Sequence, residues 1–447
     1  MGYFCYFVSM LRVSSPVLII SVLWHIFFQP PGKESTASTI SIPSGSSTAS
    51  TRSTASTKAS KSTAIPSATT AKASTYPLPQ AAERLFVCVL ADSVIVVPDG
   101  LCDVLLLVYK SRFPFGGSAR LPVIEDFKKT NPGSCVITKC GIDMRILQSK
   151  DPSPAKLKSA NGSRDLAWFE GNNFRHYAKL NLEIQSGNND EVTSYIDYFK
   201  ALREEQNKMN LKGVHIIGVS PLISSKSDTL DDDMRSQLQR YVAEIRPYAL
   251  LIRTTQLEKI PIFNFKCHLN GPSLWTHLEN VKHQVSFVQS LDFVNTVQLP
   301  SDLRILLSFS CGGYKTYYKS LRQYDLNNPD IDSLRREECT RSFLAAKNLR
   351  WDSRTCHRPM LLETDSMTNY ILTRTLRNDF VDMFDTNVTY KMKICNAQKI
   401  YNFRGGYVLF DFDQIDTGNK CGDTNFTQGF ADAHYIKTYM KTSFTHC

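Results

Sequence analysis

Three polar residues at alternate positions form the group whose types and spacing could support chemistry at one site. Asn181, Glu183 and Gln185 fall within or just after residues 179–184, an apolar run typical of a buried strand. Side chains at every second position of a strand point to the same face of the sheet. Glu183 carries an ionisable carboxyl group, whereas the amides of Asn181 and Gln185 can only form hydrogen bonds near neutral pH. The trio therefore indicates one carboxyl group between two amides on one face of a strand.

The sequence carries no pattern typical of a metal centre or a bound cofactor. Its nine histidines form no HExxH motif and its cysteines form no CxxC pair, so zinc sites are not predicted. A phosphate-binding turn would need several glycines after the first predicted strand, where the chain instead reads Ala91-Asp92-Ser93. We therefore expect neither a metal nor a cofactor.

Cysteines and acceptor sites for glycans indicate an oxidising compartment. Twelve cysteines are scattered along 447 residues, which is a high number for a protein of the cytosol. Asn161, Asn387 and Asn425 each begin an Asn-x-Ser/Thr sequence, the acceptor for N-linked glycans. Together these features predict an extracellular protein with disulfides.

Residues 1–30 predict either a signal peptide or an uncleaved membrane anchor. Arg12 precedes the apolar run Pro16–Phe28, which is shorter than an ideal spanning helix of about 20 residues. No clear cleavage site follows, because the chain continues with Gln29 and two prolines. Both alternatives stay open, and both place the rest of the chain outside the cell, either secreted or tethered at its surface.

Residues 31–82 predict a disordered stalk. Ser and Thr make up 23 of the 41 residues at 35–75, and the pentamer STAST occurs three times. Such a composition buries too little apolar surface to fold. It is typical of mucin-like, O-glycosylated segments, and a plain flexible linker has the same character. Either interpretation separates the folded part of the chain from its N-terminus.

The formal net charge of +10 does not by itself indicate a nucleic-acid-binding protein. Part of the excess lies in the first 84 residues, and the remainder is spread over the later sequence without a long basic run. No aromatic-interleaved RNA motif and no zinc-finger spacing accompanies the charge. We expect no nucleic acid partner.

From residue 83 onward, short apolar runs alternate with amphipathic stretches, which predicts a parallel sheet with crossover helices. The predicted strands are Leu85–Leu90, Val104–Tyr109, Cys135–Lys139, Lys179–Ile184, Val214–Val219, Tyr248–Thr254, Leu303–Ser308 and Gly406–Phe412. The predicted helices between them include Val192–Asn207, Met234–Ile245 and Leu278–Leu291. Eight such strands predict an α/β fold, a (β/α)₈ TIM barrel over residues 83–447. Residues 311–404 are too many for one helix with two loops, so we expect a small inserted α+β lobe between strands seven and eight.

The eighth predicted strand carries the most specific motif in the chain. It reads GGYVLFDFD at residues 405–413, and Cys421-Gly422 follows. The first strand contains Phe86-Val87-Cys88, and Leu101-Cys102-Asp103-Val104 leads into the second. In these motifs and in their order, residues 83–440 resemble glycoside hydrolase family 18, the chitinases and chitinase-like lectins. The family also carries an α+β lobe after its seventh strand.

The resemblance implies two disulfides. Cys88 would pair with Cys102, and Cys356 in the inserted lobe would pair with Cys421. Each pair would close a loop, and the second would tie the lobe to the barrel with a gain of about 2–4 kcal/mol. The resemblance does not pair the remaining cysteines.

The fourth strand decides what the resemblance implies for activity. The family carries DGxDxDxE there; the Glu is the general acid, and the Asp before it orients the substrate's N-acetyl group, which attacks the anomeric carbon. Here the stretch reads AKLNLEIQ, so Ala178, Asn181 and Glu183 replace the three Asp, and Gln185 replaces the Glu. Gln185 cannot protonate a leaving group, and general acid catalysis contributes about 10²–10⁴-fold.

A rival placement of the motif on residues 213–221 contains no carboxylate and leaves too little chain for the later helices, so we reject it.

Other positions that contact substrate in the family also differ in this chain. Arg253-Thr254-Thr255-Gln256 replaces the MxYD of the sixth strand, and Phe410 replaces the Trp at the floor of the site. Tyr109 stands where the second strand usually has Phe. If the barrel still binds sugar, the resemblance places Tyr109, Thr255, Gln256 and Phe410 at the ligand.

The sequence therefore predicts a catalytically inactive, chitinase-like extracellular protein. One hypothesis is a lectin for chitin or other N-acetylglucosamine-containing glycans. A second is a scaffold that binds extracellular proteins through its barrel loops and does not bind sugar. A third is residual glycoside hydrolase activity that depends on Glu183.

Overall fold

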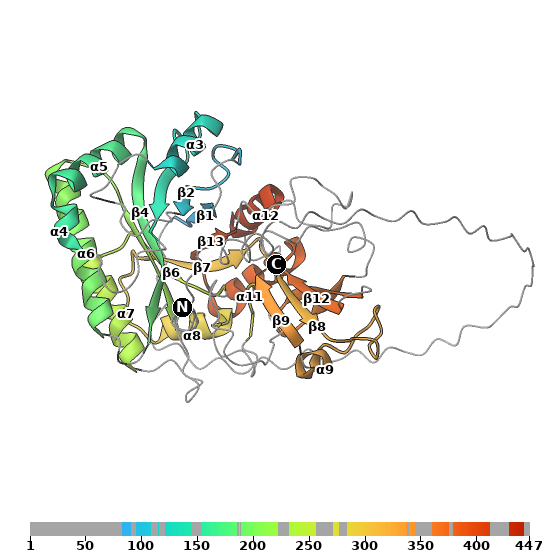
Figure 1. Ribbon diagram of the computed structural model, residues 1–447. Coiled ribbons are helices and arrows are strands. Elements are labelled where there is room, and N and C mark those ends of the chain that lie inside the picture. The colour runs from blue at the N-terminus through green and yellow to red at the C-terminus, as the bar shows by residue number, and fades with distance from the viewer. Residues whose placement is uncertain are drawn as a thin grey trace, which may run out of the picture. The chain divides into compact units, whose positions relative to one another are not determined.

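A computed structural model describes the folded part of the chain (Figure 1). The described residues are 83–90, 95–108, 115, 121–144, 153–185, 187, 189–221, 232–255, 271–276, 284–337, 339–344, 360–374, 379–411 and 429–441. The predicted N-terminal segment 1–30 and the predicted stalk 31–82 lie outside them. Within these ranges, no helix has both the length and the apolar character that crossing a bilayer requires.

Eight parallel strands close into a barrel, as the sequence predicts. The order is β1-β13-β7-β6-β5-β4-β3-β2, and β1 pairs with both β13 and β2, so the sheet has no free edge. The bounds are β1 Phe86–Leu90, β2 Val104–Val108, β3 Lys139–Asp143, β4 Phe174–Ile184, β5 His215–Pro221, β6 Ala249–Ile252, β7 Arg304–Ser310 and β13 Gly406–Phe410. The chain is therefore an α/β protein with a (β/α)₈ TIM barrel.

Side chains along each barrel strand alternate between two apolar layers. In β1, Val87 and Val89 belong to the cluster that fills the barrel, whereas Phe86, Cys88 and Leu90 pack against the surrounding helices. All five side chains are at most 1% exposed. A strand that is covered on both faces must be apolar at nearly every position. This double burial explains why the barrel strands are recognisable as continuous apolar runs in the sequence.

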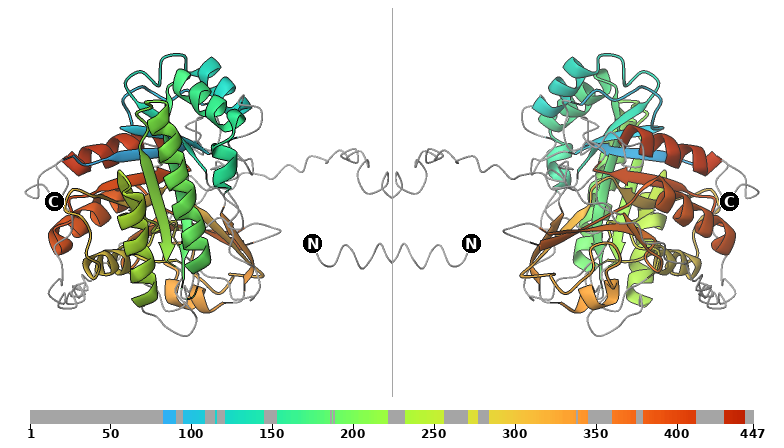
Figure 2. Two further views of the ribbon diagram at one scale, coloured as in Figure 1. Left: turned by 90° about the vertical axis from the view of Figure 1, so that its left-hand side faces the viewer. Right: turned by 90° about the vertical axis from the view of Figure 1, so that its right-hand side faces the viewer.

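Helices form the outer layer of the barrel (Figures 1 and 2). They are α3 Pro122–Thr130, α4 Pro154–Leu157, α5 Ala160–Gly171, α6 Asn189–Lys208, α7 Asp232–Ile245, α8 Phe287–Asn295, α11 Asn387–Tyr401 and α12 Gly429–Lys441. Two of them, α6 and α7, bury the periodic apolar residues that predict them. The third predicted helix starts later than expected, because a capping box of Ser286 and Gln289 sets the first residue of α8 at Phe287.

The third strand lies four residues later than the predicted run Cys135–Lys139. Val136 and Ile137 are exposed in a turn, at 77% and 74%. A disulfide from Cys135 to Cys140 closes this turn, and β3 begins only at its end. The prediction was wrong because the apolar, β-branched residues of the turn resemble a strand in sequence, although a disulfide and not burial holds them.

The chain between β7 and β13 contains the predicted inserted lobe. Its antiparallel sheet has the order β10-β11-β12-β8-β9. The elements are β8 Tyr314–Tyr318, α9 Ile331–Arg336, β9 Cys339–Leu344, β10 Leu361–Glu363, β11 Thr368–Arg374 and β12 Asp379–Phe384. A separate apolar cluster that includes Leu334, Tyr370, Leu372 and Val381 forms the core of the lobe. After β12 the chain returns to the helix layer, where α11 packs against α8 and α12.

A buried ion pair joins the end of the lobe to the helix layer. The ammonium of Lys393, in α11, lies 2.5 Å from Oδ1 of Asp385, the residue that follows β12. It also donates to the carbonyl and hydroxyl oxygens of Ser273, at 2.6 and 3.1 Å. Both charged side chains are fully buried, and the Thr389 hydroxyl donates to Asp385 at 3.1 Å. Loss of either partner would leave the other charge buried without its counter-charge.

Lys393→Met should therefore lower the free energy of unfolding by about 3–5 kcal/mol, because it strands the Asp385 carboxylate in the interior. Lys399→Met is the matched control, since Lys399 lies in the same helix and is exposed. This control should change stability by no more than about 0.5 kcal/mol. Urea denaturation followed by circular dichroism measures both variants, and equal stability of the two would contradict the role assigned to the ion pair.

Candidate functional site

The candidate site lies at the C-terminal ends of the barrel strands, where (β/α)₈ barrels carry their catalytic and binding residues. Below this level, aliphatic side chains fill the barrel. At the strand ends the filling becomes polar. The polar residues there that are at most 5% exposed include Asp143, Ser220, Arg253 and Ser308.

Strand register places these polar side chains on the inner face of the barrel. Residues that lie side by side in a parallel sheet point to the same face. Asp143 lies beside Ala178, and Ser308 lies beside Val408. Ala178 and Val408 both belong to the cluster that fills the barrel. The Asp143 carboxylate also accepts a hydrogen bond from the backbone amide of Leu180, at 3.3 Å, so the polar layer is tied to β4.

A β-bulge in β4 sets the direction of the predicted site residues. The pairing of β4 with β5 shifts register between Lys179 and Leu182. Ala178, before the shift, faces the barrel interior, whereas Leu182, after it, packs among the residues outside the barrel. One extra residue reverses the alternation. It therefore brings Asn181 and Glu183 to the same side of the sheet as Ala178.

Alternation alone does not place all the predicted positions on one face, because Ala178 and Asn181 are three residues apart. The extra residue of the bulge brings both side chains onto the same face. Gly218 in β5 leaves room for the bulge, since a Cβ at Gly218 would lie 2.6 Å from the Leu180 Cα. Gln185 follows the last residue of β4 and is exposed. Its backbone carbonyl accepts a hydrogen bond from a Gln237 side chain in α7, at 2.8 Å, which anchors the chain as it leaves the barrel.

Glu183 is the exposed carboxyl group among these positions. Partial burial raises its pKa above the ordinary value, Glu191 in the first turn of α6 raises it further, and the Lys179 ammonium opposes both. Lys179 lies over the ring of Tyr195, 5.3 Å from its centre. A carboxyl group with a raised pKa is suited to donate a proton. Glu183 is therefore the described residue of β4 on which any residual acid catalysis would depend.

Phe410, the predicted floor of a sugar site, is covered by Arg253. The guanidinium carbon of Arg253 lies 4.7 Å from the centre of the Phe410 ring. Phe410 is 1% exposed and Arg253 is 5% exposed. A guanidinium stacks well on an aromatic face because it is planar and weakly hydrated. The face that would receive a sugar ring is therefore already occupied by a side chain of the same chain.

Thr255, another predicted ligand contact, belongs to the network that holds Arg253 in place. Its hydroxyl accepts a hydrogen bond from Nε of Arg253 at 3.2 Å. The Ser308 hydroxyl accepts from the backbone amides of Thr254 and Thr255, at 2.8 and 2.9 Å, and lies 3.1 Å from the Thr255 hydroxyl. Thr255 is 5% exposed. The segment after β6 is thus fastened to β7.

Some of the remaining predicted positions are described by the structure, and others are not. Cys88 and Cys102, the pair that the resemblance implies, form a disulfide. Asn161 is exposed in the first turn of α5, and Asn387 is partly buried at the start of α11. Tyr109, Gln256, Cys356, Cys421 and Asn425 lie outside the described residues. Where side chains are described, no three of His, Cys, Asp or Glu come together as metal ligands would.

Sequence reasoning missed two central residues of this site, Asp143 and Arg253. Asp143 escaped notice because the third strand was placed four residues too early, so its C-terminal end was not recognised. Arg253 lies in the segment that replaces the family's MxYD, and that comparison predicts no role for its side chain. A lone charged residue at the end of an apolar strand was the available signal, since barrel strands end at the functional face.

Comparison with known proteins supports the barrel architecture. No protein-family model and no curated protein sequence matches this chain. Among solved structures, a group IV chitinase of Ostrinia furnacalis in complex with allosamidin has a TM-score of 0.52 and 12% identity, over 80% of this chain and 100% of that one. An immunomodulatory active chitinase from Trichuris suis has a TM-score of 0.52 and 11% identity, with the same coverages. A chitinase from Rhizomucor miehei has a TM-score of 0.51 and 12% identity, over 79% and 100%. At such identities the likeness shows a chitinase-like fold.

The environment of Glu183 predicts opposite effects of two substitutions on its pKa. Glu191→Gln should lower the pKa of Glu183, because it removes a like charge that favours the protonated form. Lys179→Met should raise it, because it removes the cation that favours the carboxylate. Carbon NMR of labelled Glu side chains during a pH titration measures both shifts. Shifts of the same sign in the two variants would contradict this account of the site.

Proposed function

We propose that this protein is a non-hydrolytic binding protein built on a chitinase-like barrel. The observation that carries the proposal is the contact of Arg253 with Phe410. In the family that the sequence resembles, the aromatic residue at this place of the last strand is the floor on which sugar lies. Here the ring is 1% exposed beneath a guanidinium. A sugar ring would have to displace Arg253 and break its bond to Thr255 in order to stack there.

The residues of the fourth strand support the absence of hydrolysis. Gln185 stands at the position of the general acid and has no proton to release near neutral pH. Glu183 has a raised pKa, but it stands two residues earlier, at the position that orients the N-acetyl group in the family. Asn181 replaces a further carboxylate. The chain therefore has no general acid at the position from which the family protonates the leaving-group oxygen.

A protein partner fits this arrangement better than a chitin oligosaccharide. Stacking of sugar rings needs an exposed aromatic face, and the predicted one is covered. Loops at the C-terminal ends of barrel strands are the usual recognition surface of this fold. The disulfides Cys88–Cys102 and Cys135–Cys140 agree with an oxidising, extracellular setting. We infer that the barrel presents its loops to an extracellular protein and that the lectin hypothesis is the weaker of the two.

The full chain should release no fluorophore from a fluorogenic chitobiose substrate, because no general acid stands at the scissile bond. Glu183→Gln should give the same background rate as the unmodified chain. An active chitinase serves as the positive control for the assay. A measurable rate in the unmodified chain that disappears in E183Q would show that Glu183 acts as the acid, and the proposal would then fail.

The full chain should also show no binding of chitin oligosaccharides on a glycan array. Phe410→Leu keeps the barrel filled and removes the aromatic face, so it should leave this result unchanged. Arg253→Ala should uncover the ring and lower the free energy of unfolding by about 2 kcal/mol, the value of a desolvated cation–π contact. Oligosaccharide binding by the unmodified chain that is lost in F410L would contradict the proposal in favour of a lectin.

A further inference from the structure

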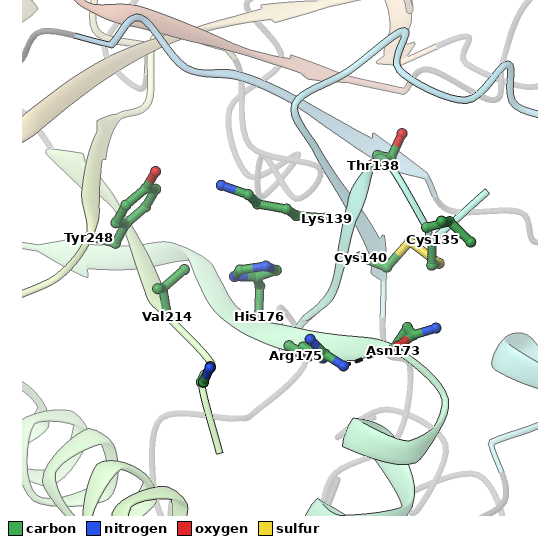
Figure 3. A pocket seen from close by; sticks show the side chains of 11 residues that line it. Cys135, Thr138, Lys139, Cys140, Asn173, Arg175, His176, Val214 and Tyr248 are labelled. Carbon is green, nitrogen blue, oxygen red and sulfur yellow. Dashed lines mark hydrogen bonds between the residues drawn. A yellow bond between two sulfur atoms is a disulfide. The ribbon is translucent and has the colours of Figure 1, made fainter. Parts of the chain in front are cut away.

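A concave site lies at the N-terminal end of the barrel, where the strands begin (Figure 3). A cavity of about 490 Å³ opens between the N-terminal ends of β3, β4, β5 and β6. Small-molecule sites usually measure about 300–1,000 Å³. Its wall includes Lys139, His176, Lys212 and Tyr248, together with the turn that the Cys135–Cys140 disulfide closes. The volume therefore suits a small ligand.

The cavity wall is cationic. No acidic side chain is among the described residues that line it. Arg175, also in the wall, has a partner, because its Nε lies 2.8 Å from Oε1 of Glu170. Lys139 and Lys212 are exposed, and neither forms an ion pair with any described side chain. Two ammonium groups thus remain available to a ligand in the cavity.

His176 adds an inward-facing polar group to this wall. It is 8% exposed, and its Nδ1 is buried without a hydrogen-bond partner among the described atoms. Figure 3 shows its ring near the side chains of Lys139 and Tyr248. His176 is one of the residues that line the cavity, so its imidazole lies beside the space that a ligand would occupy. Burial lowers the pKa of His176 to about 4, helped by Lys139 and Arg175, so the ring is neutral at pH 7.

The wall is held in place without a ligand. Besides its disulfide, the turn before β3 is bound through Thr138, whose hydroxyl donates to Asp99 at 2.7 Å and accepts from the Gly100 amide at 2.8 Å. Gly213 allows the loop that carries Lys212 to touch β4, since a Cβ there would lie 2.1 Å from the Arg175 carbonyl oxygen. Donors that are already in position lose little conformational freedom when a ligand binds.

We propose that this cavity binds an oxyanion, the sulfate or phosphate group of a small ligand. The ammonium groups of Lys139 and Lys212 supply charge-assisted hydrogen bonds, and the neutral imidazole of His176 adds a polar group beside them. The Tyr248 ring covers the less polar part of the ligand. The guanidinium carbon of Arg304, at the start of β7, lies 4.2 Å from the centre of that ring and helps to hold it, while Nη2 of Arg304 is paired with Oε2 of Glu83 at 3.7 Å. The site is at the other end of the barrel from Arg253 and Phe410, so it does not depend on the proposed function.

Calorimetric titration of the full chain tests this proposal at constant ionic strength. The probes are inorganic sulfate, inorganic phosphate, and the matched pair N-acetylglucosamine 6-sulfate and N-acetylglucosamine. We expect binding of the charged probes and none of the uncharged sugar. Tighter binding of the sulfate ester than of both inorganic ions would identify an esterified ligand, and equal binding would identify the free ion.

Lys139→Ala combined with Lys212→Ala should weaken binding at least about tenfold, since each lysine contributes a charge-assisted bond. Both residues are exposed, so the fold should persist, and Lys399→Ala on the distant helix α11 is the matched control with unchanged affinity. As a second readout, a bound oxyanion should raise the pKa of His176 in proton NMR titrations. Absence of binding by every charged probe, or equal binding by the double variant, would overturn the proposal.

Discussion

The stacking of the Arg253 guanidinium on the Phe410 ring governs the end of the barrel where this fold performs its chemistry. The two groups lie 4.7 Å apart and are almost completely buried. A buried charge needs partners for its donors. The Thr255 hydroxyl accepts from Nε of Arg253, and the Ser308 hydroxyl in turn accepts from the backbone amide of Thr255. This contact and the hydrogen bonds beside it connect three parts of the barrel, namely β13, β7 and the segment that follows β6. They also cover the ring at the floor of the barrel.

The two ends of the barrel differ in the surroundings of their polar residues, although the Ser220 hydroxyl at the C-terminal end also lacks a partner among the described atoms. At the C-terminal end, Asp143 accepts from a backbone amide and Ser308 bonds to the segment beside it. At the N-terminal end, Lys139 and Lys212 face a cavity and Nδ1 of His176 lacks a partner among the described atoms. Polar groups that satisfy one another stabilise a structure, whereas unsatisfied groups around a cavity are free to bind a ligand. The structure therefore supports a small-molecule site at the N-terminal end of the barrel, away from the C-terminal face where this fold usually binds its ligands.

The barrel shares its architecture with chitinases, but shared architecture does not determine activity. The bulge in β4 illustrates the difference. It still turns Asn181 and Glu183 toward the inside of the barrel, because a bulge depends on backbone pairing and on the space that Gly218 leaves. The chemistry at those positions depends on the side chains alone, and an amide cannot take the part of an acid. The backbone geometry at those positions therefore does not by itself establish an activity.

The barrel and its lobe could be predicted from the sequence because strands buried on both faces are apolar at nearly every position, as in β1 and β13. The same signal failed at Cys135–Lys139, where a local disulfide holds an exposed apolar turn. The identity of Gln185 determined by itself that no titratable proton stands at that position. The exposure of Phe410 was decided only by the tertiary structure, because it depends on Arg253, which follows β6 and is far from Phe410 in the chain. Stacking across a closed barrel is a contact between residues far apart in the chain, and no local pattern in the sequence encodes it.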